Sequence, residues 1–153
     1  TQGILDVVRK IQTMISEEGL QGQVSVTVNQ RGVTISMAEH ALFERGSARV
    51  VPAGKRLLAR MAPFLNAVSV PLAVEGHTDS LPVMGGVYET NWGLSSMRAA
   101  TVAAYLADVG GVDPLRLEAV GFSQYRPLVP NDSEPHRALN RRVDLVLLSH
   151  MSQ

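Results

Sequence analysis

Apolar residues near the start of the chain recur at helical spacing. They are Ile4, Leu5, Val8, Ile11 and Ile15. A glycine at position 19 follows them, and glycine is a common end for a helix. The pattern therefore predicts an amphipathic helix over residues 4–18.

The next segment changes to a strict alternation of apolar and polar positions. The apolar positions are Val24, Val26 and Val28, followed by Val33, Ile35 and Met37. Residues 29–32, Asn-Gln-Arg-Gly, lie between the two groups and are typical of a turn. Because a half-buried strand repeats every two residues, this segment predicts a β-hairpin over residues 24–37.

The middle of the chain predicts a helix and a strand after an irregular stretch. Residues 38–52 show no clear period, with Leu42 and Phe43 as their apolar anchor. A helix is expected from Pro52 to about residue 65, with a kink or break at Pro63 because proline removes a backbone donor. Residues 70–74 form a short apolar strand that runs into Glu-Gly-His.

The second half predicts one long helix, two strands and two loops. The helix covers residues 94–109, and Ser95 is a plausible N-cap for it. The remaining predicted elements are a loop at 80–90, a strand at 117–120, a loop at 122–136 and a strand at 142–148. Since strands alternate with helices, we expect an α/β fold with helices packed on a single sheet.

Composition is that of an ordinary globular domain. The chain has 153 residues, of which 45% are hydrophobic and 18% charged, with 14 basic and 14 acidic side chains. This balance gives no reason to expect a nucleic-acid partner. There is no cysteine, which excludes disulfides and thiolate sites. No apolar run is long enough to span a membrane, and because the chain starts at Thr1 we expect a fragment of a longer protein.

Four short motifs follow one another in a specific order. They are Gly76-His77-Thr78-Asp79, then Asn91-x-x-Leu94-Ser95-x-x-Arg98-Ala99, then Gly121 with Pro127, then Asn140-Arg141-Arg142-Val143. This order resembles the signature of the OmpA C-terminal domain family. The resemblance implies an α+β sandwich, in which an N-terminal helix and a β-hairpin precede a mixed sheet with helices on one face. It also implies one domain over 1–153, with a linker helix at 1–20 and a binding core at about 21–150.

Members of that family bind peptidoglycan non-covalently through diaminopimelate in its stem peptide. Diaminopimelate presents an ammonium and a carboxylate on one carbon. A receptor therefore needs an anion and a bidentate cation on opposite sides of a small pocket. Asp79 suits the ammonium and Arg98 suits the carboxylate. The alternative is a purely structural role, in which these two residues form a salt bridge between a loop and a helix.

Other residues enter the expected site through the same resemblance. Asn91 supplies an amide to ligand or loop, and the segment around Phe43-Glu44-Arg45-Gly46 lines a second wall with backbone groups. The remaining expected ligand-binding residues are Thr78 and Leu94. Residues expected to support the site from behind are His77, Ser95, Arg141 and Arg142. Trp92 either packs over the loop or stacks on a sugar.

The stretch between Asp79 and Arg98 is longer than in the plain OmpA and Pal branches. The pattern T-D-x-x-P-V through Y-x-x-N-W-x-L-S-x-x-R-A is similar to the MotB branch. Gly93 and Met97 depart from it, because a glutamate and a smaller residue are usual there. This branch implies a periplasmic, homodimeric anchor of the flagellar stator, joined to a MotA-like channel subunit through a transmembrane helix absent from this chain.

Two other functions compete with this interpretation. A generic OmpA-like or Pal-like cell-wall tether would share Asp79 and Arg98. An enzyme could use Glu75, His77 and Asp79 for acid–base or metal chemistry. However, side chains that alternate along a strand end point to different faces, and no second histidine stands at a ligand spacing. We therefore expect no catalysis, no metal site and no cofactor.

Overall fold

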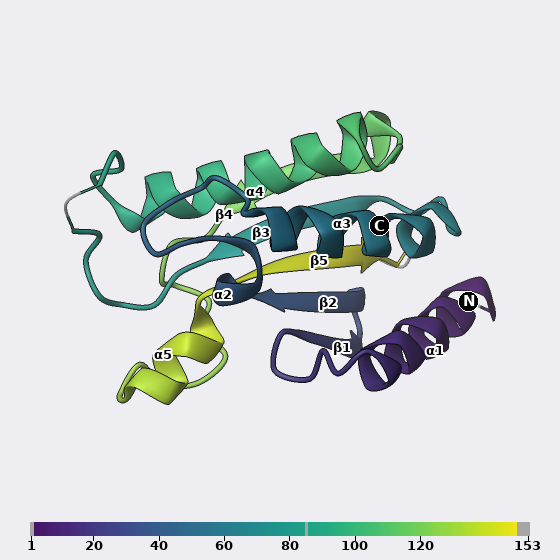
Figure 1. Cartoon of the computed structure of the whole chain (residues 1–153), viewed down its shortest axis with the longest axis horizontal. Helices are drawn as coiled ribbons and strands as arrows, with labels where there is room; N and C mark the ends of the chain where they lie inside the picture. Colours follow the sequence, from purple (N-terminus) through teal and green to yellow (C-terminus); the bar gives the residue numbers. More distant parts are fainter. Residues whose placement is uncertain (1, 85, 150–153) are drawn as a thin grey trace.

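Five strands form one mixed sheet, in the order β1-β2-β5-β3-β4, in the computed structural model, which describes residues 2–84 and 86–149. The strands are β1 Val24–Asn29, β2 Gly32–Ala38, β3 Leu72–His77, β4 Leu117–Gly121 and β5 Arg142–Leu148. The helices are α1 Gln2–Glu17, α2 Glu39–Leu42, α3 Pro52–Asn66, α4 Asn91–Asp108 and α5 Glu134–Asn140, with a 3-10 turn at Pro114–Arg116. Figure 1 places these elements. Residue 85 of the expected loop and residue 150 of the expected core lie outside the described residues.

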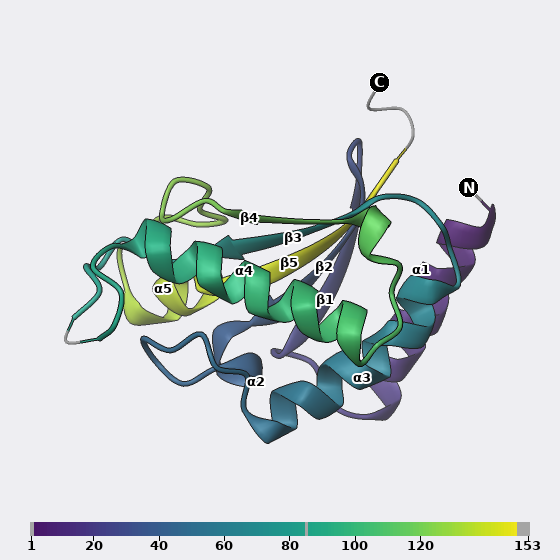
Figure 2. The ribbon, with the colours of Figure 1, turned by 90° about the horizontal axis from the view of Figure 1, so that it is seen from above.

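The sheet is antiparallel except at one edge. β1 pairs with β2, β2 with β5, and β5 with β3 in antiparallel fashion, whereas β3 and β4 run parallel. The parallel pair is joined through α4, as a parallel connection requires a crossover. Helices α1, α3 and α4 lie along the same face of the sheet (Figure 2). The predicted mixed α/β fold with helices on one face is confirmed.

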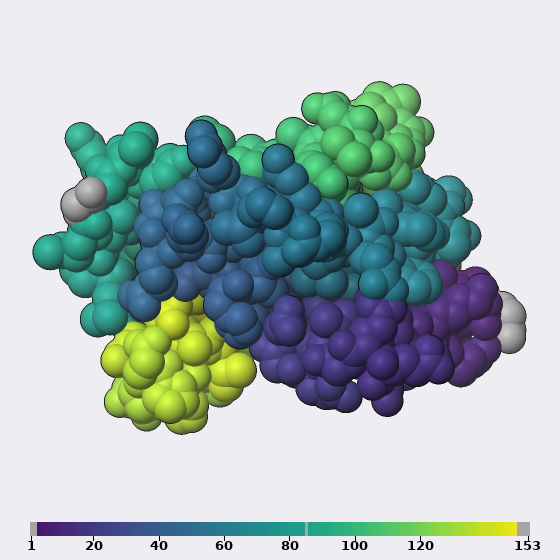
Figure 3. Space-filling view, viewed as in Figure 1, coloured from purple at the N-terminus to yellow at the C-terminus, as the bar shows by residue number. Residues whose placement is uncertain are grey.

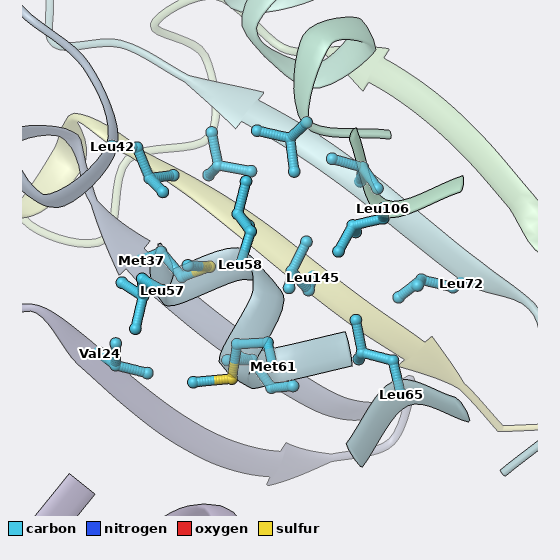
Figure 4. Close-up of a cluster of buried hydrophobic side chains, with 14 of the residues drawn as sticks. Val24, Met37, Leu42, Leu57, Leu58, Met61, Leu65, Leu72, Leu106 and Leu145 are labelled. Atoms are coloured by element: carbon cyan, nitrogen blue, oxygen red, sulfur yellow. The ribbon is translucent and has the colours of Figure 1, made fainter. Parts of the chain in front are cut away.

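Alternation along the strands builds the core between the sheet and these helices. Val33, Ile35 and Met37 of β2 are at most 1% exposed, and so are the matching residues of β5. Leu58, Met61 and Leu65 of α3 are fully buried against them (Figure 4). Among the described residues, no helix is both long and apolar enough to cross a membrane.

The predictions of the first helix, the hairpin and the last two strands are confirmed. The expected break at Pro63 is wrong, because α3 continues through this residue to Asn66. Both Pro63 and Ala59, whose carbonyl loses its helical donor, lie on the exposed side of the helix. Water can satisfy that carbonyl, while the opposite side stays packed on the sheet.

The expected Ser95 cap is also wrong. Helix α4 starts earlier, and its N-cap is Thr90, whose side chain accepts a hydrogen bond from the Gly93 backbone N–H at 3.2 Å. Ser95 lies inside the helix, where its hydroxyl donates to the Trp92 carbonyl at 3.2 Å and accepts from the Ser123 N–H at 3.0 Å.

Two segments that were expected to be irregular contain short helices. Residues 38–52 begin with α2, and the expected loop at 122–136 ends in α5. The N-cap of α5 is Ser133, whose side chain accepts from the His136 N–H at 3.3 Å, and Pro135 stands in the first turn of the helix. A serine followed by an early proline is a typical helix start.

Candidate functional site

Three segments that are far apart in the sequence meet at one end of the molecule. They are the chain after α2, the loop after β3 together with the first turns of α4, and the end of α5 (Figure 3). A cavity of about 180 Å³ lies between them. Of the residues expected to bind a ligand, those that line it are Arg45, Thr78, Asp79, Asn91, Leu94 and Arg98.

Asp79 stands two residues after the end of β3 and is 5% exposed. One carboxylate oxygen accepts the Leu81 N–H at 3.0 Å, which tightens the start of the loop. The other oxygen accepts a hydrogen bond from Arg141 Nη1 at 2.8 Å. Asp79 is therefore held in place with its charge already partly matched.

Arg98 reaches the cavity from α4 and is 2% exposed. The helix lies directly against β3 because Gly76 has no side chain: a Cβ there would stand 2.1 Å from the Ser95 carbonyl oxygen. Arg98 donates from Nε to the Ser47 carbonyl at 2.7 Å and from Nη2 to the Glu44 carbonyl at 3.1 Å.

The carboxylate that balances Arg98 is Glu39, which the sequence analysis missed. Arg98 Nη1 donates to Glu39 Oε2 at 2.7 Å, and Arg141 Nε donates to Glu39 Oε1 at 3.0 Å. Burial lowers the pKa of Arg98 below its ordinary value, and the Glu39 carboxylate opposes this shift. One carboxylate thus serves two buried guanidinium groups.

Arg141 completes this group and does more than support it from behind. It lines the cavity and is bonded to Glu39, Asp79 and, through Nη2 at 2.6 Å, Glu134. Burial lowers the pKa of Arg141, but the carboxylates of Glu134, Asp79 and Glu39 outweigh it and raise that pKa. We call Glu39, Asp79, Arg98 and Arg141 the pocket cluster.

Asn91, Thr78 and Leu94 shape the cavity wall. The Asn91 amide donates to the Leu81 carbonyl at 3.0 Å and to the Asp79 carbonyl at 3.4 Å, so it joins α4 to the loop. The Thr78 hydroxyl donates to the Asp79 carbonyl at 2.8 Å. Leu94 is 6% exposed and gives the wall an apolar patch.

The segment Phe43-Glu44-Arg45-Gly46 contributes in three ways. Phe43 is buried, and the Arg98 guanidinium lies 4.6 Å from the centre of its ring. Glu44 offers its carbonyl to Arg98, while its side chain is exposed. Arg45 is exposed, lines the cavity and forms a long ion pair of 3.8 Å with Glu39, so it places a cation at the mouth.

His77 and Arg142 belong to a second group of charges, on the face of the sheet away from the helices. We call Arg31, Glu75, His77, Arg142 and Asp144 the sheet-face cluster. The expectation that Glu75 and His77 point to different faces is wrong, since residues two apart on a strand share a face. Burial on its own would raise the pKa of Glu75, but the nearby His77 and Arg31 lower it to about 2.

Two residues near the cavity act on neighbouring loops. Asn140 is fully buried, and its carbonyl oxygen accepts from the Leu128 and Val129 N–H groups at 2.8 and 3.2 Å. Trp92 packs on Tyr125 with ring centres 5.5 Å apart, and both rings remain more than half exposed. Trp92 thus has a packing contact, and stacking on a sugar stays a prediction.

Comparison with known proteins finds similar proteins and similar solved structures over most of this chain. Motility protein B of Bacillus subtilis is 27% identical over 94% of this chain, and the match covers 55% of that protein. The chain thus spans about half the length of this relative. Two solved structures also match, a MotB-like protein from Desulfovibrio vulgaris and the cell wall anchor of the T6SS from Pseudomonas aeruginosa.

Both structures cover nearly all of the chain. The Desulfovibrio protein has a TM-score of 0.86 at 26% identity and covers 97% of this chain and 96% of its own. The Pseudomonas anchor has a TM-score of 0.80 at 32% identity, with 89% and 94% covered. A family model matches residues 42–141, which include the Asp79 and Arg98 motifs. This chain belongs to the OmpA family, and MotB periplasmic domains are among its similar structures.

Proposed function

We propose that this domain binds peptidoglycan without catalysis, by holding the zwitterionic end of diaminopimelate in the cavity beside the pocket cluster. What carries the proposal is the position of Asp79 and Arg98 on the wall of one small cavity of about 180 Å³. A cavity of roughly 150 Å³ accommodates a benzene-sized molecule. The carbon that bears an ammonium and a carboxylate is of similar size.

Both charged residues keep hydrogen-bonding capacity for a ligand. A guanidinium has five N–H donors, and three of those on Arg98 reach Ser47, Glu39 and Glu44. A carboxylate has about four acceptor sites, and Asp79 uses two of them for Leu81 and Arg141. The ligand carboxylate can therefore add to Arg98 and its ammonium to Asp79 without displacing the existing bonds.

The cluster is also prepared for a ligand of zero net charge. Glu39 and Asp79 match Arg98 and Arg141 within the pocket cluster. A zwitterion leaves this balance unchanged, whereas a simple anion or cation would leave an unmatched charge in a buried place. Each charge-assisted contact contributes about 1.5–3 kcal/mol. Arg45 can close over the ligand carboxylate from the mouth.

The wider role that follows is anchoring of a flagellar motor stator to the cell wall. The similarity to motility protein B and to a MotB-like structure supports it. In this proposal residues 1–153 form one periplasmic domain, with a core at about 21–150. Helix α1 leads toward a membrane-spanning helix that pairs with a MotA-like channel subunit. The domain works as a homodimer, so sedimentation at several concentrations should reveal a dimer.

A cell-wall tether without a motor role is the second candidate. The observation in its favour is that the T6SS cell wall anchor is 32% identical, a higher value than for the MotB-like structure. Deletion of the gene for the full-length protein separates the two candidates. Paralysed cells that still build flagella would support the stator anchor, and normal swimming would support the tether.

Sedimentation with purified peptidoglycan sacculi tests the binding site itself. Asp79→Ala and Arg98→Ala should each weaken binding about 10- to 100-fold, which corresponds to about 1.5–3 kcal/mol. The matched control removes Asp6 and Arg9, an exposed aspartate–arginine pair on α1 with a 3.1 Å contact. Competition by a stem peptide with diaminopimelate, but not by one with lysine, is expected. Unchanged binding in both cavity variants would reject the assigned site.

A further inference from the structure

Three residues with metal-binding side chains meet on the sheet face away from the helices. Glu75 and His77 come from β3 and Asp144 from β5, and Glu75 lies directly opposite Asp144 in the antiparallel register. They are 4%, 4% and 6% exposed. One ligand atom from each of the three lies within 4.8 Å of the other two.

His77 is the residue that the fold leaves unexplained. Its ring stacks on Phe122, with centres 5.3 Å apart, but within the described part of the chain neither ring nitrogen has a hydrogen-bond partner. An unsatisfied buried polar group costs about 1–3 kcal/mol. Nε2 faces Glu75 Oε1 at 3.8 Å and Asp144 Oδ2 at 3.7 Å. These separations are too long for hydrogen bonds, so the three atoms border a gap.

That gap has the dimensions of a metal site. Zinc bonds to imidazole nitrogen and carboxylate oxygen are about 2.0–2.2 Å long. Ligand atoms around a tetrahedral ion therefore stand roughly 3.4 Å apart. Nε2 needs to approach each oxygen by only a few tenths of an ångström to reach that spacing, and the ligand atoms of the three residues already lie within 4.8 Å of one another.

The two carboxylates are held so that one oxygen of each stays available. The shorter bonds are on the far oxygens: Arg31 Nη2 donates to Glu75 Oε2 at 2.5 Å, and Ser36 Oγ to Asp144 Oδ1 at 2.7 Å. The oxygens that face His77 receive only longer bonds, from Arg31 Nη1 at 3.3 Å and from Arg142 Nε at 3.2 Å. Outer hydrogen bonds of this kind orient metal ligands.

We propose that Glu75, His77 and Asp144 bind one Zn²⁺ ion, which joins β3 to β5 behind the peptidoglycan cavity. One imidazole with two carboxylates is a ligand set that suits zinc better than the all-oxygen shells of Ca²⁺ or Mg²⁺. Arg31, whose side chain is 52% exposed, can turn outward and so reduce the positive charge near the ion. The site is independent of the pocket cluster, so it can be present whether or not the domain binds peptidoglycan.

Titration of the 153-residue chain with ZnCl₂ in a calorimeter tests this proposal. One ion per chain should bind, and His77→Gln should weaken binding about 100-fold or more. Loss of an outer partner costs about 10- to 100-fold, so Ser36→Ala should fall in that lower range. His40→Gln, at an exposed histidine, and His136→Gln, which removes a surface pair with Asp132, should bind as the wild type does.

Two further measurements separate a loss of metal binding from a loss of folding. If His77→Gln does not fold, as judged by circular dichroism, Glu75→Gln and Asp144→Asn replace it, because both keep the side-chain shape. Co²⁺ should give a visible absorption band in the wild type that these variants lose. No saturable binding at one ion per chain, or equal binding by wild type and a folded ligand variant, would overturn the proposal.

Discussion

Arg141 and Arg142 are neighbours in the sequence, yet they belong to the two different clusters. Apart from the half-exposed Arg31, the residues of both clusters are buried, and both clusters combine arginines with carboxylates. They differ in arrangement: in the pocket cluster the single carboxylate of Glu39 serves Arg98 and Arg141. In the sheet-face cluster each arginine has its own carboxylate, Glu75 for Arg31 and Asp144 for Arg142.

The difference shows what distinguishes a binding site from a charged support. Buried ion pairs by themselves are a weak sign of function, because they also occur where they only hold strands together. The pocket cluster adds a cavity and unused donors on Arg98. The sheet-face cluster instead adds an unpartnered histidine within the described residues. The two clusters are therefore suited to different ligands.

The largest loss in the free energy of unfolding is expected from Glu39→Gln, because this change leaves two buried arginines without their shared carboxylate. Breaking a buried ion pair on one side costs about 3–5 kcal/mol, and urea unfolding should show a loss of this size. Glu134→Gln is the matched control: Glu134 also binds Arg141, but its side chain is 54% exposed. An exposed pair contributes only about 0–1 kcal/mol. Equal losses in the two variants would contradict the central role of Glu39.

The next largest effect is a loss of stability at low pH, which arises from Glu75 in the sheet-face cluster. The pKa of Glu75 is about 2 in the folded protein, compared with an ordinary value of 4.5. A lowered folded-state pKa stabilises the protein above pH 4.5, and this contribution is lost as the pH falls toward 2. By linkage it amounts to at most about 3 kcal/mol. Chemical denaturation of metal-free protein should therefore show a steeper loss between pH 4.5 and 2 than in Glu75→Gln. Parallel pH profiles would argue against this pairing.

A matched pair of aspartates separates ligand binding from support. Asp79 accepts from Arg141 at 2.8 Å and Asp144 from Arg142 at 3.2 Å, and both are nearly buried. Asp79→Asn should weaken binding to sacculi about 10- to 100-fold, because the ligand ammonium loses its anion. Asp144→Asn should change that binding less than about threefold. If both variants lost binding equally, the clusters would act as one unit.

The periodicity of the sequence was enough to predict most of the fold. Strands repeat every two residues and helices every 3.6, so the hairpin and α1 could be located from spacing alone. The short helices were missed because α2 and α5 contain only four and seven residues. At that length there is almost no period to detect, and capping residues such as Ser133 carry the signal.

The sequence predicts several residues of the site but not which of them contact one another. The motif order pointed to Asp79 and Arg98, whereas the contact between Asp79 and Arg141 joins residues 62 positions apart. No local pattern contains that information. Glu39 did leave a signal: Val33, Ile35 and Met37 face the core, and the same alternation places Glu39 on that side. An acid at the end of a buried series of positions requires a cationic partner.

The smallest change in stability is expected at the start of α4, close to the cavity. Thr90 caps this helix and Gly93 is its third residue, so Gly93→Glu would create the sequence Thr-x-x-Glu, a capping box. A Cβ at position 93 meets nothing closer than 3.8 Å, so the change fits. Replacing a helical glycine by alanine stabilises the fold by about 0.5–1 kcal/mol, and an acidic residue in the first turn adds about 0.3–1 kcal/mol of stability. Gly93→Ala measures the first part alone, so the melting temperature should rise from wild type to Ala to Glu. Since Asn91 of the same turn holds the cavity loop, a melting temperature that rises for Ala and not for Glu would mean that this turn is set by the loop and not by its cap.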